Sequence, residues 1–576
     1  MKPQNRIYEE LKVNNYRELL QSCQNRFGSR PAFRFKKDKT SKTPEFMEVS
    51  YSSHLQDVRH FSSKLLSLGL EKKRIALIGQ NQYFWPLSYM AINTGNMICV
   101  PLDYMLPANE IENLLIRSKA EAIIFDAKYQ PIMEQIAAKN TTCLKHFICM
   151  DIENYLHQTS KPYGDSLLIT KCLEEGKKIY ETNPGLYENA KPENTAMSLM
   201  LFTSGTTGNS KAVMLSQANI CSNVSAMTTL INAKLEEDCV LSFLPLHHTF
   251  ECTATYLFCF YRGFTICYAD SLKAIPKNLN EYKITGMVCV PALLEIMYRQ
   301  IHKTIKSKGL TVPFQFLMGF SNFLRFFHID LRRKLFKMVL ENLGHLRIVI
   351  YGSAPVDVKI VKFFETIGIS MVQGYGLTET SPVIACESDK FKCPGSCGMP
   401  LYNEEVVISE PNEKGVGEIL VKGPNVMLGY YENDQANQET FTADGFLRTG
   451  DLGFLDKNGF LHITGRKKDV IVLANGKNIF PQEIEQLLNA SLLVEESFVY
   501  VKDEKLCAKL VYSSDNEALQ GKNENEISSC LDEVIKGINH SLPAYKAIRK
   551  FTITTVPLIK TTTQKIKRHE EIKLVD

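Results

Sequence analysis

Short apolar strands alternate with helical segments from residue 74 to about residue 125, and this order constrains the fold more than any other feature. Strands are expected at RIALIG, MICVPL and EAIIFD, and helices at FWPLSYMAINTG and PANEIENLLIRSK. A β-α-β-α-β order predicts a parallel sheet with helices on its faces. The strand expected at RIVIYG (347–352) follows a helical pattern and predicts a second unit of the same class.

The chain changes character after about Pro394. Short β-rich pieces then alternate with Gly, Asn and Asp turns, which predicts a small β-barrel-like module. Beyond GRKKD, one helical and two strand patterns predict an α+β domain. A chain of 576 residues should hold about three or four packing units. We expect an α/β protein with an N-terminal domain over 1–466 and a small mobile α+β C-terminal domain over 467–576. The N-terminal domain would comprise two parallel-type α/β subdomains, at about 1–190 and 191–393, and the β module at 394–466.

Composition and charge argue against some partners and indicate the redox compartment. The net charge of +4 is small for this length and argues against nucleic acid as a partner, because such a surface usually needs a concentrated basic face. The 16 cysteines are scattered, mostly among apolar neighbours, as buried thiols in a reducing compartment are. Cys393 and Cys397 form one close pair (CPGSC). No second pair or histidine at ligand spacing follows closely, so we interpret them as ordinary thiols.

Neither a secretory signal nor a membrane span is expected. The N-terminus, MKPQNRIYEELKVNN, is charged, and the most apolar segment is interrupted by Arg262 and Gly263. That segment falls short of the ~20 apolar residues that a spanning helix needs. We therefore expect a cytoplasmic protein. Residues 312–339 are aromatic-rich with a basic patch beside them. They are interpreted either as a helix pair packed on the sheet or as a peripheral membrane contact.

The stretch FTSGTTGNSK (202–211) follows an apolar run and combines hydroxyl side chains with two glycines and a lysine. Glycines let backbone N–H groups approach an anion, hydroxyls donate, and the lysine adds charge. The stretch is not a Walker loop, because the lysine is displaced and Ala212 stands where a magnesium-binding hydroxyl would be. The following VMLSQ has the pattern of a strand. We predict a β-turn-β flap over a polyphosphate.

This loop resembles the signature loop of the adenylate-forming (AMP-binding) superfamily, which includes acyl-CoA synthetases, luciferases and adenylation domains of peptide synthetases. Six further motifs stand in the family's order and span almost the whole chain. They are LPLHHTFE (244–251), YGSAP (351–355), QGYGLTETSP (373–382), RTGDLG (448–453), GRKKDVIVLANGKNIFPQEIE (465–485) and TTTQKIKR (561–568). Among family members, the chain most resembles bacterial long-chain fatty acyl-CoA synthetases.

The resemblance implies two half-reactions in one site, with ATP, Mg²⁺ and coenzyme A. A carboxylate attacks the α-phosphate of ATP, so that pyrophosphate leaves and an acyl-adenylate forms. The thiol of coenzyme A then attacks the acyl carbonyl, and AMP departs. The first step needs neutralised phosphate charge and a stabilised five-coordinate phosphorus.

For the phosphates, the resemblance assigns a loop and an acidic motif. The residues that would cradle the β- and γ-phosphates are Thr203, Ser204, Gly205, Thr206, Thr207, Gly208 and Lys211. Glu379 would be the magnesium ligand, since a hard carboxylate oxygen suits that ion. Thr378 would contact the α-phosphate region. The alternative for TET is a helix cap after a glycine turn.

For adenosine, the resemblance assigns two further motifs, an aspartate and an arginine. The residues that would form the adenine slot are Gly352, Ser353, Ala354, Pro355, Gln373, Gly374, Tyr375 and Gly376. Asp451 would accept both ribose hydroxyls, and Arg466 would assist. Outside such a context, an Asp after a Gly is a common turn residue.

Near the C-terminus, Lys565 is the expected catalytic residue, because the family's lysine at this position reaches the α-phosphate during adenylation. A mobile charge suits a step that requires domain closure, although a basic KIKR tail is also interpretable as a solvated surface. Lys468 would be the hinge about which the small domain rotates, and Gly476 would line the pantetheine tunnel. Such a movement is a plausible gate on turnover.

His248 occupies the position of the family's acyl-site histidine and would orient the carboxylate or flank the pyrophosphate; His247 is the weaker candidate. A metal site at this pair is discounted, because only Glu251 lies at suitable spacing. The apolar residues of CTATYLFCF and NICSNVSAMTTLI would line a long acyl channel or belong to the core.

The chain departs from the family at four positions. Ser210 replaces the usual proline, Ala212 a glycine, Gln217 a histidine and Gln564 the glycine before the catalytic lysine. Three functions remain open. The first is ligation of a medium- or long-chain fatty acid to coenzyme A, and the second is use of an aryl acid or of a carrier protein's phosphopantetheine. The third is non-catalytic binding of an acyl group or nucleotide, against which Glu379, Asp451 and Lys565 argue.

Overall fold

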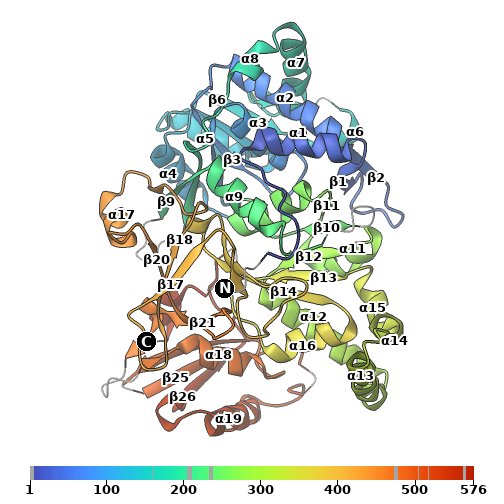
Figure 1. Cartoon of the computed structure of the whole chain (residues 1–576), viewed down its shortest axis with the longest axis vertical. Coiled ribbons are helices and arrows are strands. Elements are labelled where there is room, and N and C mark those ends of the chain that lie inside the picture. The colour runs from blue at the N-terminus through green and yellow to red at the C-terminus, as the bar shows by residue number, and fades with distance from the viewer. Residues whose placement is uncertain are drawn as a thin grey trace.

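The structure is a computed structural model of the whole chain (Figure 1). It describes residues 6–159, 161–203, 210–232, 238–472, 478–503, 505–516, 518–561 and 566–575.

An eight-stranded sheet confirms the predicted alternation. Its order is β19-β9-β8-β4-β3-β5-β6-β7, and β4, β3, β5, β6 and β7 are parallel. The strands are β3 (Arg74–Ile78), β4 (Ile98–Leu102), β5 (Ala122–Asp126), β6 (His146–Met150), β7 (Leu167–Leu168), β8 (Met197–Thr203), β9 (Lys211–Ser216) and β19 (Gly429–Tyr430). The helices that follow β3, β4 and β5 are α3 (Phe84–Thr94), α4 (Ala108–Ser118) and α5 (Gln130–Lys139).

A nine-stranded sheet confirms the second unit. Its order is β16-β15-β14-β13-β12-β10-β11-β1-β2, and the six strands from β14 to β1 are parallel. The strands are β1 (Pro31–Lys36), β2 (Phe46–Ser50), β10 (Cys239–Ser242), β11 (Thr265–Tyr268), β12 (Gly286–Cys289), β13 (Ile348–Tyr351), β14 (Ser370–Gly376), β15 (Val383–Cys386) and β16 (Met399–Pro400). Strands β1 and β2 come from the first 50 residues, so the two sheets interleave along the chain across the predicted boundary near residue 190. The predicted boundaries at residues 393 and 466 stay predictions.

The two sheets share one hydrophobic core. Ile75 of β3, Phe33 of β1 and Ile266 of β11 belong to the same buried cluster as Trp85 of α3 and Tyr256. The helices in this part of the chain are α1 (Tyr16–Phe27), α2 (Tyr51–Ser67), α6 (Ile152–His157), α7 (Ile169–Thr182), α8 (Gly185–Asn189), α9 (Gln217–Met227), the π-helix η2 (Phe250–Phe258) and α10 (Cys259–Tyr261). Every residue of α3 is buried, and its buried polar side chains Asn93 and Thr94 donate to the carbonyls of Tyr89 and Met90 in the same helix.

The β module and the C-terminal part follow the sheets. Strands β17 (Glu405–Ser409), β18 (Gly417–Lys422), β20 (Leu447–Leu455) and β21 (Leu461–Arg466) form an antiparallel sheet of that order. Within the described residues this module is a four-stranded sheet and not a closed barrel. The C-terminal part has its own core, which includes Ile484, Val499 and Leu531. Its elements are β22 (Ile471–Val472), β23 (Asn478–Ile479), α18 (Pro481–Asn489), β24 (Glu496–Lys502), β25 (Lys505–Val511), α19 (Glu524–Ser541), β26 (Lys550–Thr554) and α20 (Arg568–Glu571).

The segment 312–339 forms helices at the edge of the molecule, below and to the right of the nine-stranded sheet in Figure 1. The helices of this region are α11 (Ile275–Glu281), α12 (Pro291–Ser307), α13 (Thr311–Phe326), α14 (Arg332–Leu335), α15 (Lys337–Leu340) and α16 (Val358–Ile367). Phe314 packs in the core, whereas Phe316 is 73% and Phe326 80% exposed. In the part of the chain that the structure describes, no helix has the length and apolar character that a membrane crossing requires.

Candidate active site

A cavity of about 1120 Å³ lies where both large sheets, the four-stranded sheet and the C-terminal part meet. Many of the predicted residues line it together. They are Thr203, Lys211, His248, Ser353, Gly374, Tyr375, Gly376, Thr378, Glu379, Arg466 and Lys468. Gly352, Ala354, Pro355, Gln373 and Asp451 are not among the lining residues. The site is therefore built from segments that lie up to 265 positions apart (residues 203 and 468).

The predicted flap begins and ends as expected. Thr203 pairs with Lys211 in the antiparallel β8–β9 ladder, so the strand predicted at VMLSQ is confirmed at β9. Arg117 of α4 donates to the Ser210 hydroxyl at 2.7 Å. The predicted phosphate ligands Ser204, Gly205, Thr206, Thr207 and Gly208 lie outside the described residues.

Tyr430 contacts both of the elements that are predicted to bind phosphate. Its hydroxyl donates to Glu379 Oε1 at 2.8 Å, and the Lys211 ammonium lies 4.6 Å from its ring centroid. Burial, aided by the charge of Glu379, raises the pKa of Tyr430, so this hydroxyl stays a donor. Tyr430 was missed in the sequence because its strand, β19, pairs with β9 from far along the chain.

Asp451 and Arg466 lie opposite each other on β20 and β21. Asp451 Oδ1 is 3.0 Å from Arg466 Nε, and Oδ2 accepts a hydrogen bond from the Tyr375 hydroxyl at 2.8 Å. The carboxylate is almost fully buried. A carboxylate has about four lone-pair positions, so it retains two for further hydroxyl donors.

Close backbone approach explains the glycines near Tyr375. A Cβ at Gly376 would lie 1.7 Å from the Pro382 carbonyl oxygen, and one at Gly352 would lie 2.8 Å from the Gly374 carbonyl oxygen. Ser353 has φ 73°, a left-handed conformation that is rare outside glycine and often marks functional sites. Gln373 is buried and accepts a hydrogen bond from the Tyr351 hydroxyl at 3.1 Å. This contact links β14 to the neighbouring strand β13.

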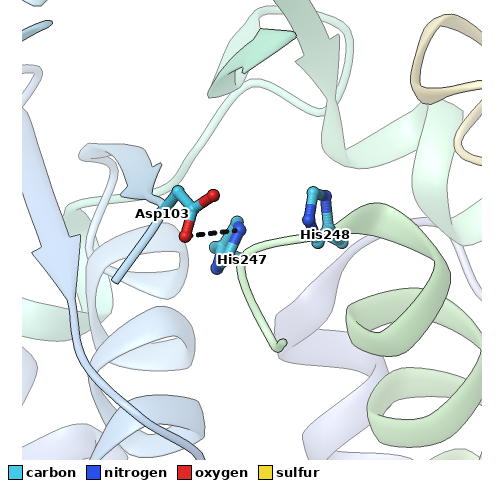
Figure 2. Close-up of side chains that lie close together, drawn as sticks. All are labelled: Asp103, His247 and His248. Atoms are coloured by element: carbon cyan, nitrogen blue, oxygen red, sulfur yellow. Dashed lines mark ion pairs between the residues drawn. The ribbon is translucent and has the colours of Figure 1, made fainter. Parts of the chain in front are cut away.

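Asp103, His247 and His248 lie together at another wall of the cavity (Figure 2). His247 Nε2 is 3.6 Å from Asp103 Oδ1, and the two imidazole centroids are 4.2 Å apart. Burial lowers the pKa of His247 to about 3, which keeps this ring neutral. Asp103 was missed because it follows β4, whereas the histidines follow β10. Sequence spacing offers only Glu251 as a carboxylate for the histidines, whereas the fold places Asp103 beside them.

Glu251 lies on η2 and points into the core. Its two oxygens accept hydrogen bonds from the hydroxyls of Ser242 (2.6 Å) and Thr255 (2.7 Å). Burial raises the pKa of Glu251 to about 8, so the side chain is largely neutral at pH 7. A neutral acid with both oxygens occupied is a poor metal ligand.

The C-terminal part contributes cations to the cavity. Lys468 lies in a short 3₁₀ turn after β21, and burial, together with the charge of Arg466, lowers its pKa. Lys560, Thr561 and Lys567 also line the cavity. Lys565, which stands between Thr561 and Lys567 in the sequence, and Gly476 are outside the described residues.

The departure at Gln217 belongs to the core of the molecule. Gln217 is fully buried, its Nε2 donates to the Asn93 carbonyl at 2.8 Å, and its Oε1 accepts from the Tyr16 N–H at 3.0 Å. It therefore links α9 to α1 and α3.

These features define an adenylate-forming fold, and comparison with known proteins gives the family. The sequence profile described as AMP-binding enzyme matches residues 20–431, and the profile of the AMP-binding enzyme C-terminal domain matches residues 468–573. The chain belongs to the AMP-binding enzyme family and to its class of acid–thiol ligases. The resemblance inferred from the motifs is confirmed.

Relatives and solved structures agree with this assignment. A long-chain-fatty-acid–CoA ligase FadD15 of Mycobacterium bovis is 26% identical over 560 residues, covering 90% of each chain. A long-chain-fatty-acid–[acyl-carrier-protein] ligase AEE15 of Arabidopsis thaliana is 25% identical and covers 88% of this chain and 76% of its own length. The crystal structure of the anthranilate CoA ligase AuaEII in complex with anthranoyl-AMP superposes with a TM-score of 0.75 at 19% identity, covering 97% of each chain.

We predict that Glu251→Gln changes how stability depends on pH. Because the folded pKa is raised above the ordinary value of about 4.5, folding holds a proton that the unfolded chain releases, so stability falls as pH rises from about 4.5 to 8. The variant lacks this loss. It should gain about 1–3 kcal/mol relative to the parent between pH 5 and pH 8, measured by denaturant unfolding. If stability depends on pH in the same way in the two proteins, the raised pKa of Glu251 is contradicted.

Proposed function

We propose that the chain joins a medium- or long-chain fatty acid to coenzyme A through an acyl-adenylate and releases AMP and pyrophosphate. One observation carries the proposal: Lys211, Glu379 and Arg466, which pairs with the buried Asp451, line one cavity next to apolar side chains. This arrangement offers a cation, a hard oxygen ligand and a hydroxyl acceptor beside a hydrophobic wall.

In the adenylation step, each group acts on a different part of the reactants. Lys211 and the 203–208 loop neutralise the β- and γ-phosphates, while Asp451 holds the ribose hydroxyls and Arg466 fixes its carboxylate. Glu379 would hold Mg²⁺, because one of its oxygens is oriented by Tyr430 and the side chain lines the cavity; bound there, the ion supplies charge stabilisation. Thr378 contacts the α-phosphate, and Lys565 stabilises the charge that develops on it.

In the thioester step, the small domain rotates about Lys468, so that Lys565 leaves and Gly476 lines the tunnel for pantetheine. The acyl carbonyl would thus face Lys565 during adenylation and the pantetheine tunnel during thioester formation. His248 orients the acyl carboxylate, and the neutral His247, beside Asp103, holds the position of the adjacent ring.

The acid is proposed from the apolar wall and from the relatives. Met227, Leu230 and Ile231, at and after the end of α9, line the cavity together with Ala254 and Phe258 of η2. These come from the two segments expected to form an acyl channel. The curated relatives described above are named for long-chain fatty acids. The second candidate is an aryl acid, which the anthranilate ligase neighbour favours, and a carrier-protein acceptor is the alternative to coenzyme A.

We expect acid-dependent pyrophosphate release with saturated fatty acids of about 12–18 carbons, at least tenfold above that with benzoate or anthranilate, since each buried methylene contributes about 0.8 kcal/mol. The assay measures pyrophosphate with the purified protein, ATP and Mg²⁺. The acceptor is determined by supplying coenzyme A or a phosphopantetheinylated carrier protein. Activity confined to aryl acids would overturn the chain-length proposal.

Lys565→Ala should lower the adenylation rate by at least 100-fold and leave thioester formation from supplied acyl-adenylate within about threefold, because the lysine acts on the phosphorus only. Lys573→Ala is the matched control, since Lys573 is exposed near the same end of the chain. If Lys565→Ala retains normal adenylation, Lys565 has no catalytic role.

We also propose that helices α13 and α14 dock on an anionic membrane surface, where fatty acids partition. The exposed apolar side chains of this face are Val312, Phe316, Phe320, Phe323, Phe326, Phe327, Ile329 and Leu331. Residues 311–340 contain five basic residues and one acidic residue, Asp330. Apolar side chains flanked by cations match the interface of a bilayer with anionic lipids. A second copy of this face would bring like charges together.

We expect the protein to co-sediment with vesicles that contain phosphatidylserine, more weakly at 0.5 M salt. Replacing Phe316, Phe323 and Phe326 together by Ser should reduce vesicle binding at least tenfold, while pyrophosphate release with a water-soluble acid stays unchanged. Leu272→Ser combined with Val556→Ser is the control, because these side chains are 66% and 65% exposed elsewhere. Two results would contradict membrane docking. One is equal sedimentation of the parent and the triple variant, and the other is a parent dimer that the triple variant no longer forms.

A further inference from the structure

Three side chains of metal-ligating type meet outside the active-site cavity. Ligand atoms of Cys393, Asp456 and His462 all lie within 4.8 Å of one another. From the sequence alone, Cys393 and Cys397 are interpreted as ordinary thiols, because no histidine follows them closely. The fold brings a histidine and a carboxylate to Cys393 from the β20–β21 hairpin, so that argument does not hold for Cys393.

Backbone pairing brings the segment 393–398 to the hairpin. The Cys397 N–H donates to the Leu461 carbonyl at 2.7 Å, and the Leu461 N–H donates to the Gly398 carbonyl at 2.8 Å. A Cβ at Gly398 would lie 1.9 Å from the carbonyl carbon of Cys386, so only glycine permits this close approach. The pairing at Leu461 places Cys393 beside the next residue of β21, His462.

Each ligand is held in place by contacts of its own. Asp456 Oδ1 accepts from the N–H groups of Asn458 (2.8 Å) and Phe460 (3.0 Å), while Oδ2 lies 3.4 Å from His462 Nε2. The His462 ring stacks on Phe454 with centroids 4.8 Å apart and an interplanar angle of 7°. The Cys393 N–H donates to Glu387 Oε1 at 2.8 Å.

The donor set selects the ion. A thiolate, an imidazole and a carboxylate together suit Zn²⁺, whereas Mg²⁺ and Ca²⁺ prefer oxygen ligands only. The separation of 3.4 Å between Asp456 Oδ2 and His462 Nε2 fits two ligands about 2.0–2.2 Å from one zinc ion. The side chains of His462 and Asp456 are 22% and 23% exposed, so an ion and a water molecule can reach them.

We propose that Cys393, Asp456 and His462 bind one zinc ion, with water in the fourth position. Binding forms bonds to Sγ, to a carboxylate oxygen and to an imidazole nitrogen, and the thiol proton passes to solvent. The ion would cross-link the segment before β16 to the hairpin that carries Asp451 and Arg466. The site is independent of the proposed ligase reaction, because none of its three residues lines the cavity.

The test titrates metal-free protein with Co²⁺, which reports thiolate ligation by a sulfur-to-metal charge-transfer band and four-coordination by its visible spectrum. We expect one equivalent to bind, Zn²⁺ to displace it, and Zn²⁺ to raise the melting temperature. Cys393→Ser should abolish the charge-transfer band and weaken Zn²⁺ binding at least 100-fold. Cys143→Ser, which removes an exposed thiol elsewhere, should bind as the parent does.

If Cys393→Ser folds poorly, His462→Gln serves as a second variant. It should still show the thiolate-to-Co²⁺ band, but it should bind the metal much more weakly. Absence of a charge-transfer band in the parent would overturn the proposal, as would parent-like Zn²⁺ affinity in either variant. None of these measurements depends on ligase activity, so failure of the zinc site and failure of the proposed function are distinguishable.

Discussion

The shared core of the two large sheets is the constraint on which the site depends. Because β1 and β2 from the start of the chain belong to the nine-stranded sheet, the chain enters the eight-stranded sheet before the nine-stranded sheet is complete. The core then fixes the carboxyl ends of their parallel strands around one cavity. Asp103 follows β4, His247 follows β10, Ser353 follows β13 and Thr378 follows β14. Ligands in open α/β sheets bind outside such carboxyl ends, and here two sheets contribute ends to the same cavity.

The cations around the cavity come from the end of the four-stranded sheet and from the C-terminal part. Arg466, Lys467 and Lys468 adjoin at the end of the four-stranded sheet, and Lys560 and Lys567 face the same cavity. Three of these cations have a carboxylate partner: Lys467 lies 3.0 Å from Glu418, Lys560 2.7 Å from Glu496 and Lys567 3.1 Å from Glu570. For Lys468, burial, together with the charge of Arg466, lowers the pKa. In the proposed reaction, a bound polyphosphate would therefore favour the charged form of Lys468.

The sequence predicted local features well and contacts between distant segments poorly. Strands β3, β4, β5 and β13 carry apolar patterns between turn signals, and the strand after the glycine-rich loop has the same kind of local signal. Tyr430 has no such signal, because its role arises when β19 pairs with β9. The same limit applies to Asp103 beside His247 and to His462 beside Cys393. The exposure of Phe316 and Phe326 was also not decidable, since an apolar helix face looks the same in sequence whether protein or lipid covers it.

Burial also neutralises groups beside the apolar wall of the cavity that would otherwise be charged. Glu251 has its pKa raised to about 8 and His247 has its pKa lowered to about 3, so both are neutral over most of the range between pH 4 and pH 7. They lie beside the wall that contains Ala254 and Phe258, where a charge would favour water over a hydrocarbon chain. Elsewhere around the cavity, Asp451 and Arg466 form an ion pair. A cavity that combines this ion pair with an apolar wall fits the proposed reaction, in which a charged nucleotide meets an apolar acid.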